Sequence, residues 1–298
     1  MKETVEFRIN YDFANLLFKE DEGKDLGQLN KSVKIVELSK DDPRYNQIPI
    51  ISKKVKEKYG KGFFFGWQIK RKYVKNEIES AVLFQIKIKK TFEPSGEECG
   101  TTYDEKTSCK ICKANRKQIG LLKLKKGTIP KKDIAKTIAG EIVVSEKFKE
   151  ACKDRHLRGV EMIPIEFEEG LSSYYQLIAP SKLNLTNNTI AGGDIFNIGH
   201  EGSEATEFTV SGEYKVKLEE EVYKCPEGHL IGLNLLSEVF VSDSPLVNEY
   251  DFFSSNQKVG VRRGLLNPVS LYMCSPAFRK MVIEEDLTGF EFEVANVE

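Results

Sequence analysis

Long apolar segments are missing from this sequence. No apolar run approaches the length of a membrane-spanning helix, and the first residues, Met1–Phe7, mix charged and apolar side chains where a secretory signal would have a continuous apolar stretch. From these absences we expect neither a helical membrane protein nor a conventional exported one. We therefore expect a cytoplasmic protein with no membrane partner.

An excess of either charge is also missing. The chain has 45 Lys and Arg residues against 46 Asp and Glu residues, whereas proteins that bind nucleic acids or anionic membranes usually carry a clear basic excess. Basic runs occur at Lys53–Lys58 and Lys87–Lys90, but acidic residues lie close to both, which is typical of solvated faces. The charge balance argues against nucleic acid as the main partner.

Histidine is scarce, with 3 residues in 298, and none belongs to a recognisable catalytic motif. The sequence contains no HExxH or HxE pattern and no nucleophile elbow. We therefore assign no catalytic residue, and the sequence favours a binding role over an enzymatic one. Its length and its hydrophobic content of 40% are sufficient for a substantial core divided among two or three domains.

The 6 cysteines are few for this length, but three of them lie close together. Cys109 and Cys112 have the C-x2-C spacing at which two thiolates bind one Zn²⁺, and Cys99 lies shortly upstream. Because disulfides are disfavoured in the cytoplasm, this segment predicts a knuckle that holds a structural zinc ion. A second complete C-x2-C motif would need a cysteine at position 96, where the chain has Gly96.

A fourth zinc ligand must therefore come from elsewhere. Cys225 and His229, in the sequence Cys-Pro-Glu-Gly-His, are candidates, as are Glu97, Glu98 and a water molecule. Two alternatives stay open: the knuckle is a degenerate loop with free thiols, and Cys225 and His229 serve only turn or core packing. A catalytic zinc with three protein ligands is the least favoured interpretation, because no partner motif for it is present.

The most informative pattern is an internal repeat with a constant shift along the chain. Each copy has a strand-like segment, a serine suited to cap a helix, apolar residues along that helix, a glycine stop and a second strand-like segment. The identical residues are Ser145 and Ser275, Phe148 and Phe278, Leu157 and Leu287, Gly159 and Gly289, and Glu161 and Glu291. This pattern predicts an α+β fold with two related strand–helix–strand units, at about residues 119–168 and 259–298.

Four regions make up the expected domain organisation. Residues 1–90 form a mixed α/β N-terminal region, and residues 91–169 hold the Cys knuckle and the first unit. Residues 170–211 are rich in turn formers and are expected to be a loose connection. Residues 212–298 hold the second unit.

Three local patterns complete the secondary-structure prediction. The aromatic cluster Phe63–Trp67 is typical of a buried strand, and Ala81–Lys89 passes from an apolar run into strict alternation, which indicates another strand. At Lys131–Ala139 we expect a helix, because Ile134 and Ile138 have i,i+4 spacing.

The Cys-containing segment also resembles known proteins. The stretch Phe92–Glu105, together with Cys109 and Cys112, is similar to a set of uncharacterised bacterial proteins with this Cys module. Those proteins are similar in turn to the double-CXXCG-motif proteins, some of which are immunity proteins paired with bacterial toxins. The chain departs from that family at Gly96, which replaces one Cys of the first motif.

The C-terminal part carries a second resemblance. Gly260–Pro268 and Ser275–Val294 resemble the closing motif of the same family, and the strand–helix–strand unit resembles immunity proteins of polymorphic toxin systems. Together the two resemblances cover about residues 91–168 and 221–298.

The resemblance implies a non-enzymatic protein-binding protein of the immunity type, which neutralises a cognate toxin by covering its active site. The acidic segments Glu166–Glu169 and Glu219–Glu221 are candidate contacts if the toxin is a basic nuclease, and solvated faces otherwise. The alternative is a zinc-knuckle nucleic-acid-binding protein that uses Lys110, Lys113, Arg116 and Lys117 beside the Cys module.

Overall fold

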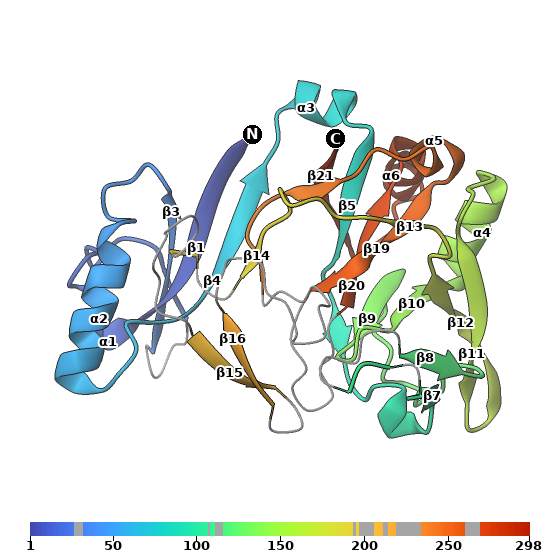
Figure 1. Cartoon of the computed structure of the whole chain (residues 1–298), viewed down its shortest axis with the longest axis horizontal. Helices are drawn as coiled ribbons and strands as arrows, with labels where there is room; N and C mark the ends of the chain where they lie inside the picture. The colour runs from blue at the N-terminus through green and yellow to red at the C-terminus, as the bar shows by residue number, and fades with distance from the viewer. Residues whose placement is uncertain are drawn as a thin grey trace. The chain divides into compact units, whose positions relative to one another are not determined.

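A computed structural model of the chain describes residues 1–26, 32–106, 108–110, 116–192, 195–196, 206–210, 214–218, 234–259 and 269–298. These residues form two compact units, Met1–Glu79 and Ser80–Glu298 (Figure 1). Strands and helices are mixed along the chain, so the predicted α+β class is confirmed.

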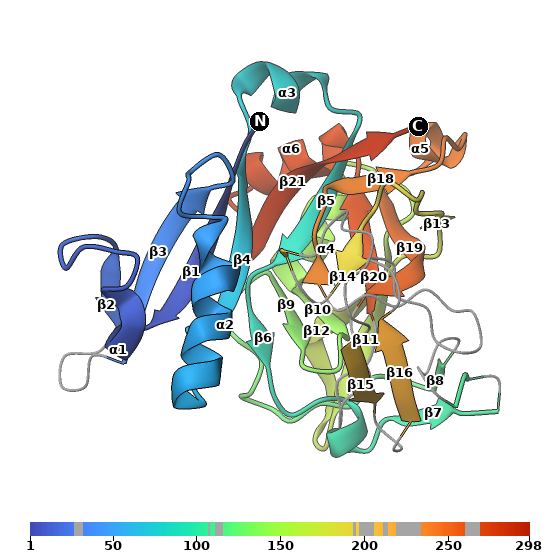
Figure 2. The same cartoon turned by 60° about the vertical axis from the view of Figure 1, so that its left-hand side comes forward.

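The first unit is a four-stranded antiparallel sheet with a long helix along one face (Figure 2). The strand order is β2-β3-β1-β4. The elements are β1 (Lys2–Asn10), α1 (Tyr11–Ala14), β2 (Lys24–Leu26), β3 (Val33–Ser39), α2 (Gln47–Tyr59), β4 (Phe64–Lys72) and α3 (Lys75–Ser80), which ends at the boundary between the units.

Strict alternation along β1 builds the core of this unit. Val5, Phe7 and Ile9 are fully buried, because successive strand residues point to opposite faces and these three share one. On the other face Lys70 of β4 bridges Glu6 and Glu37 at 2.5 and 3.1 Å. One face is thus apolar and the other is a ladder of paired charges.

The second unit contains two larger sheets and three short two-stranded ones. Its first elements are β5 (Leu83–Ile88), β6 (Thr91–Phe92), η1 (Glu97–Cys99), β7 (Thr102–Asp104), β8 (Lys117–Ile119), β9 (Ile134–Thr137), β10 (Ile142–Ser145), α4 (Glu146–Asp154), β11 (Glu161–Phe167), β12 (Gly170–Ile178) and β13 (Lys182–Leu183). The later ones are β14 (Ala191–Gly192), β15 (Thr206–Val210), β16 (Tyr214–Leu218), β17 (Asn234–Leu235), β18 (Val239–Val241), α5 (Leu246–Glu249), β19 (Phe252–Val259), β20 (Val269–Cys274), α6 (Pro276–Glu284) and β21 (Phe290–Val297).

The unit boundary differs from the domain organisation expected from sequence. The chain divides after Glu79 rather than after residue 90, because β5 is hydrogen-bonded between β20 and β21 and so belongs to the second unit. The expected loose connection at residues 170–211 begins with a regular strand, β12, that lies inside a sheet.

The helix expected at Lys131–Ala139 is wrong. Ile134–Thr137 is the strand β9, which pairs with β10 on one side and β6 on the other. Ile134 and Ala135 point to opposite faces of the sheet and are both buried. The segment is apolar because both faces of the strand are buried. Periodicity alone does not distinguish such a strand from a buried helix.

The predicted repeat extends to the topology of the two large sheets. The first sheet has the order β11-β12-β10-β9-β6, and the second contains the run β21-β5-β20-β19-β13. In both runs the first three neighbouring pairs are antiparallel and the last is parallel. Register agrees as well: Gln176 lies opposite Val143, and Gln85 lies opposite Met273, which is the equivalent of Val143 in the second repeat.

The two repeats exchange one strand. In chain order β5 precedes β6 as β12 precedes β13, so each is the first strand of its repeat. Yet β5 lies in the sheet of the second repeat, between β20 and β21, and β12 lies in the sheet of the first, between β10 and β11. The second unit is thus two repeats joined by reciprocal strand exchange.

The helix of each repeat begins as predicted. The hydroxyl of Ser145 accepts a hydrogen bond from the backbone N–H of Phe148 at 3.2 Å, and that of Ser275 accepts one from Phe278 at 3.1 Å. Pro276 occupies the first helical position of α6. The rings of Phe148 and Phe278 lie 5.8 Å apart, so the two helices share an aromatic contact.

Each helix also ends in the same way. His156 and Asp286 have φ values of 52° and 48°, the left-handed conformation that closes a helix C-terminus. Gly159 and Gly289 follow with φ values of 74° and 101°. At Gly289 a Cβ would lie 2.4 Å from the carbonyl oxygen of Ile134, so glycine is required there by close backbone approach as well as by φ.

An aspartate before β9 ties the two repeats together. Asp133 accepts hydrogen bonds from the hydroxyl of Ser145 at 2.8 Å and from the backbone N–H of Thr288, in the other repeat, at 2.7 Å. Burial opposes the charge on Asp133, but the hydrogen bonds from Thr288 and Ser145 outweigh it, and the pKa lies below its ordinary value.

The second repeat makes the equivalent contact with the first repeat. Asp251, before β19, accepts hydrogen bonds from the hydroxyl of Ser275 at 2.6 Å and from the backbone N–H of Arg158, in the first repeat, at 2.8 Å. Each aspartate thus holds the helix cap of its own repeat and the glycine turn of the other. The pairing uses the same kinds of residue and the same atoms in both directions.

Candidate functional site

The predicted Cys knuckle lies between β6 and β9 and is described in part. Cys99 ends the short helix η1, and Cys109 is a buried residue in the connection between β7 and β8. The other three proposed zinc ligands lie outside the described residues: Cys112, Cys225 and His229. The structure therefore does not test whether the five proposed ligands lie close together. Burial raises the pKa of the Cys99 thiol.

Within the described ranges, no three His, Cys, Asp or Glu residues gather in a way that would hold a metal ion. Four of the predicted donors belong to these ranges: Cys99, Cys109, Glu97 and Glu98. Glu97 bonds Arg116 and Glu98 bonds Ser95, so a zinc site there depends on ligands beyond the described ranges. The zinc assignment therefore stays a prediction.

The sequence suggests that Gly96 stands in place of a zinc-binding cysteine, but in the structure the position is occupied by glycine for a steric reason. A Cβ at this position would lie 2.5 Å from the side chain of Leu122 and 3.0 Å from the Oε1 atom of Glu141. The backbone N–H of Gly96 donates a hydrogen bond to the Glu141 carboxylate. A cysteine at this position would therefore disturb this approach.

Glu141 is the centre of a buried polar network. Its Oε1 atom accepts a hydrogen bond from the hydroxyl of Tyr103 at 2.7 Å, and its Oε2 atom accepts one from the hydroxyl of Thr137, which is fully buried. With the N–H of Gly96, three donors surround one carboxylate. These donors come from β7, β9 and the turn before η1, so Glu141 holds the Cys segment against the sheet.

Burial raises the pKa of Glu141, and the hydrogen bonds from Tyr103 and Gly96 only partly offset this effect. Burial also raises the pKa of Tyr103, and the Glu141 charge adds to the shift. The pKa values of Glu141 and Tyr103 are raised for the same main reason, because burial in a low-dielectric position disfavours the charged form of each group. Perturbed titratable groups of this kind gather at functional sites more often than elsewhere.

Arg116 closes the network from above the tyrosine ring. Its guanidinium lies 3.7 Å from the ring centroid of Tyr103, and it donates hydrogen bonds of 2.7 Å to Glu97 and to Glu105. These contacts engage one of the four basic residues that the nucleic-acid alternative requires. Lys113 belongs to the part of the chain that is not described.

A cavity of about 260 Å³ opens beside this network. The first sheet contributes Glu141 and Gln176, the β8 strand contributes Gln118, and the second sheet contributes Ser270 and Tyr272. The amides of Gln118 and Gln176 bond each other reciprocally at 2.9 and 2.8 Å. The cavity is thus built from both repeats and is lined by polar groups in fixed positions.

Comparison of the two repeats indicates which of these residues the scaffold needs. In the alignment that places Ser145 on Ser275, Glu141 falls on Leu271 and Ile142 falls on Tyr272. The backbone N–H groups of Glu141 and Leu271 both bond a strand hydroxyl, that of Thr137 or Ser255. The strand backbone is therefore the same with or without the carboxylate, and the Glu141 side chain is needed for the contact with the Cys segment rather than for the pairing of the strands.

Sequence reasoning missed this site because its residues are distant in the chain. Tyr103, Thr137 and Glu141 meet only through the pairing of β9 with β10 and the packing of the Cys segment. The signal that was available is the repeat itself, which places a carboxylate, Glu141, in register with Leu271. A charged residue that aligns with an apolar residue of the other repeat indicates that its own repeat needs a polar contact at that position.

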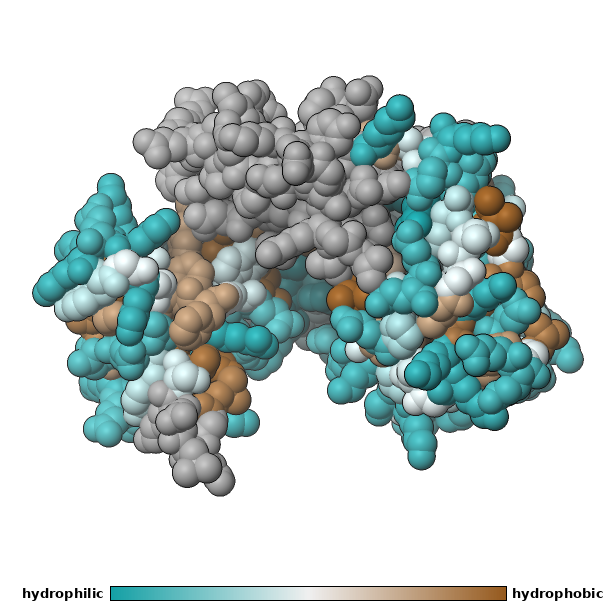
Figure 3. Space-filling model, turned by 90° about the horizontal axis from the view of Figure 1, so that it is seen from below, coloured by the Kyte–Doolittle hydropathy of each residue, from teal (hydrophilic) through white to brown (hydrophobic). Residues whose placement is uncertain are grey.

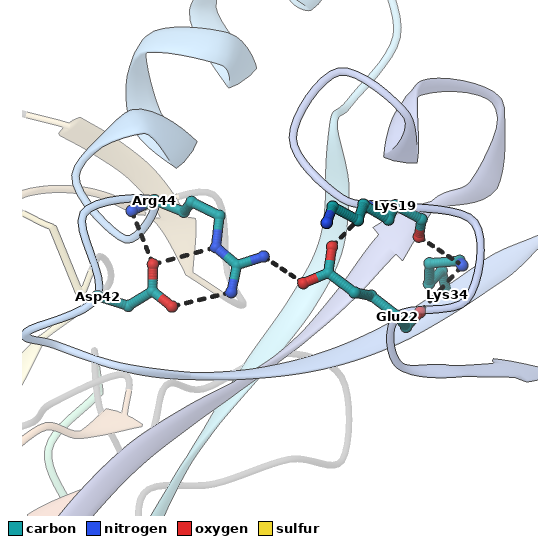
Figure 4. Close-up of polar contacts among 5 residues, drawn as sticks. All are labelled: Lys19, Glu22, Lys34, Asp42 and Arg44. Carbon is teal, nitrogen blue, oxygen red and sulfur yellow. Dashed lines mark hydrogen bonds and ion pairs between the residues drawn. The ribbon is translucent and has the colours of Figure 1, made fainter.

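A second polar cluster lies in the first unit and serves structure (Figure 4). Lys34, only 3% exposed, donates hydrogen bonds to the carbonyls of Glu20 and Glu22 at 2.6 and 2.9 Å. Arg44 binds the Glu22 carboxylate and also Asp42, at 2.9 Å, and these partners raise the pKa of Arg44. The cluster fixes the loop before β2 against β3, and its charged groups therefore stabilise the fold of the first unit.

The acidic segment Glu166–Glu169 is partly neutralised. Glu166 lies 3.8 Å from the ammonium of Lys123, and Glu169 lies 3.1 Å from that of Lys126. Exposed pairs of this kind are weak and exchange readily with other partners. The segment therefore presents mixed charge, in keeping with the mostly hydrophilic surface in Figure 3, where hydrophobic residues form small patches.

No described helix is both long and apolar enough to cross a membrane. The arginine-containing segment Gly260–Pro268, the acidic segment Glu219–Glu221 and the residue His200 lie outside the described ranges. No protein-family model matches the sequence, and no curated protein matches it.

Proposed function

We propose that this protein is a non-enzymatic, cytoplasmic binding protein of the immunity type, which neutralises a bacterial toxin by covering its active site. The partner class comes from the resemblance of the Cys segment and of the closing repeat. The observation that carries the proposal is the mutual engagement of the charged groups around the cavity. Glu141 accepts three hydrogen bonds, and Arg116 is held by two carboxylates and an aromatic ring.

Groups engaged in this way favour recognition over proton transfer. A general base needs an oxygen that is open to the substrate, whereas both oxygens of Glu141 already accept hydrogen bonds. Binding proteins gain affinity and specificity from side chains whose positions are fixed before the partner arrives, because less conformational entropy is then lost on association. The strand-exchanged repeats supply the rigid frame that this mode requires.

The proposal includes a structural zinc ion held by Cys99, Cys109, Cys112 and either Cys225 or His229. Thiolate and imidazole ligands suit Zn²⁺, and a closed site would fasten the Cys segment at a second point besides Glu141. Elemental analysis of the purified protein should find about one zinc ion per chain. Changing Cys109 or Cys112 to Ser should reduce the zinc content, with Cys152→Ser, a buried thiol of α4, as the control. A metal-free, fully folded protein would refute the zinc assignment.

Capture of the partner tests the main proposal. The full chain, carrying an affinity tag, is co-expressed with an inactivated form of the protein encoded by the neighbouring gene, and the complex is isolated at moderate salt. We expect an equimolar complex that persists through gel filtration. Tight binding to DNA or RNA that weakens steeply with salt, without any protein partner, would support the zinc-knuckle alternative instead.

A further inference from the structure

We propose that the exposed face of the helix α2, in the first unit, docks onto an acidic surface of the partner protein. This inference rests on the proposed function, and it adds the surface that meets the partner and the charge that the partner presents. It is inferred from the unpaired charge of α2, from exposed apolar side chains near its two ends and from the paired state of the acidic segment Glu166–Glu169.

The lysines of α2 have no acidic partner. Among the described residues, no carboxylate lies within ion-pair distance of the four exposed lysines Lys53, Lys54, Lys56 and Lys58. Elsewhere in the same unit charges are paired: Lys70 binds both Glu6 and Glu37. The positive charge of α2 is therefore open to a partner.

The fold accounts for half of this charge. Lys56 and Lys58 lie in the last turn of α2, where the helix dipole favours cations. Lys53 and Lys54 lie further from the helix end, at i,i+3 from Lys56 and i,i+4 from Lys58, and like charges at these spacings repel each other. The helix gains no stability from Lys53 and Lys54, whereas an acidic surface placed against them would relieve the repulsion.

Exposed apolar side chains accompany these lysines. Ile50 is 56% exposed near the start of α2, and Tyr59, its last residue, is 52% exposed. The ring of Tyr59 lies 5.1 Å from that of Phe13, so its position is set before a partner arrives. Apolar and aromatic anchors surrounded by charged residues are typical of protein–protein interfaces.

The pattern along the exposed face favours a protein over a nucleic acid. Ile50, Lys53, Lys54 and Glu57 have the i, i+3, i+4, i+7 spacing of one helix face, and all four are exposed. A phosphate backbone that followed this face would meet an isoleucine and a carboxylate between the lysines. A folded acidic surface can place apolar contacts at Ile50 and carboxylates at the lysines.

The sign of the partner's charge follows from the distribution of charge along the chain. Residues 1–79 contain 17 Lys and Arg against 13 Asp and Glu, and residues 80–298 contain 28 against 33. The acidic segment of the second unit is partly neutralised, because Glu166 and Glu169 each have a lysine within ion-pair distance. The basic face of α2 is not neutralised, so charge complementarity calls for an acidic partner.

Binding kinetics of the full chain with the inactivated protein encoded by the neighbouring gene test this proposal, between about 50 and 500 mM sodium chloride. The double variant Lys53→Glu with Lys54→Glu should weaken the complex at least about tenfold at low salt, chiefly by slower association, and the difference should shrink at high salt. Lys54→Glu also places a glutamate four residues before Lys58, a favourable helical pair, so the fold is preserved. Thermal unfolding of the variant checks this point.

A matched control reverses two adjacent exposed lysines of the second unit, Lys131→Glu with Lys132→Glu, which changes the net charge equally. Its affinity should stay within about twofold of the original. Ile50→Ala should speed dissociation at every salt concentration, and Leu171→Ala, at a residue that is 68% exposed, should not.

Three outcomes would overturn the inference. Equal affinity of the α2 variants and their controls would remove it and leave the proposed function intact. Failure of the original chain to bind any protein partner would remove both. Binding of a single-stranded oligonucleotide more tightly than the protein partner, lost in the Lys53→Glu, Lys54→Glu variant, would assign the face of α2 to nucleic acid instead.

Discussion

At the residue scale, the site depends on a glycine and a carboxylate that fit each other. Gly96 occupies the position where a cysteine would complete the zinc motif, and its missing side chain lets Glu141 reach the backbone of the Cys segment. Sequence reasoning located Gly96 but not its purpose, because Glu141 is distant in the chain and their approach depends on the folded sheet. The helix-capping residues were predictable, since a serine and the N–H three residues later are local partners.

Replacing Glu141 by Leu, the residue of the other repeat, tests the network. We expect a loss of about 1–3 kcal/mol in the free energy of urea unfolding, because the hydroxyl of Tyr103 and the N–H of Gly96 lose their acceptor. Glu141→Gln should cost less, since its amide oxygen still accepts. The exposed Glu161, on β11, provides the control: Glu161→Leu should change stability by less than about 0.5 kcal/mol. A Glu141→Leu variant as stable as the original would contradict the network's role.

At the element scale, the sequence predicted helix N-caps better than helix ends or strand partners. The two helices of the repeat begin at the predicted serines, but each closes at a left-handed residue, His156 or Asp286, three residues before the glycine predicted as its stop. The helix α2 was missed because Pro49 lies in its first turn, the only part of a helix that tolerates proline, although Ile48 and Val55 have the i,i+7 spacing of a helix face. At the strand β9 the sequence pattern predicts a helix, because the strand is buried on both faces and its apolar residues do not alternate with polar ones.

The glycine turns of the two repeats give a graded prediction. Gly289→Ala places a Cβ 2.4 Å from the carbonyl of Ile134, and Gly159→Ala places one 3.0 Å from the side chain of Tyr250. Gly127 also has a positive φ, but nothing lies within 4 Å of its added Cβ. In thermal unfolding we expect Gly127→Ala to cost about 1 kcal/mol from backbone conformation alone. Gly159→Ala should cost more, and Gly289→Ala the most, by a further ~1–3 kcal/mol from overpacking.

Equal losses for the three alanine variants would show that backbone conformation alone sets the cost. A smaller loss at Gly289 than at Gly127 would contradict the close approach of the two repeats at Ile134.

At the scale of the second unit, strand exchange is the feature that sequence could not supply. The helices and their flanks repeat clearly, but β5 and β12 share little beyond the buried glutamines Gln85 and Gln176. Which sheet each strand enters is decided by long-range pairing, and a hydrophobic pattern fixes only its face and register. The repeat predicted two related units, and the structure adds that each is completed by a strand of the other.

Cleavage between the repeats tests this arrangement. A protease site inserted at the turn Glu168–Glu169 separates β11 from β12 and divides the chain into halves that still share two sheets. After cleavage we expect both halves to elute together at the volume of the uncut protein. They should separate only in denaturant, because each half contributes an interior strand to the other's sheet. Separation of the halves in native buffer would contradict the exchange.

The central claim, that the chain acts by binding, is tested most directly by titrating it against the catalytically active partner protein encoded by the neighbouring gene. The residual activity of the partner is measured at increasing molar ratios of the chain, with both proteins well above their dissociation constant. We predict a linear fall to zero at one equivalent, with both proteins recovered intact. Inactivation by a small fraction of an equivalent would indicate an enzyme, and unchanged activity at several equivalents would contradict neutralisation by binding.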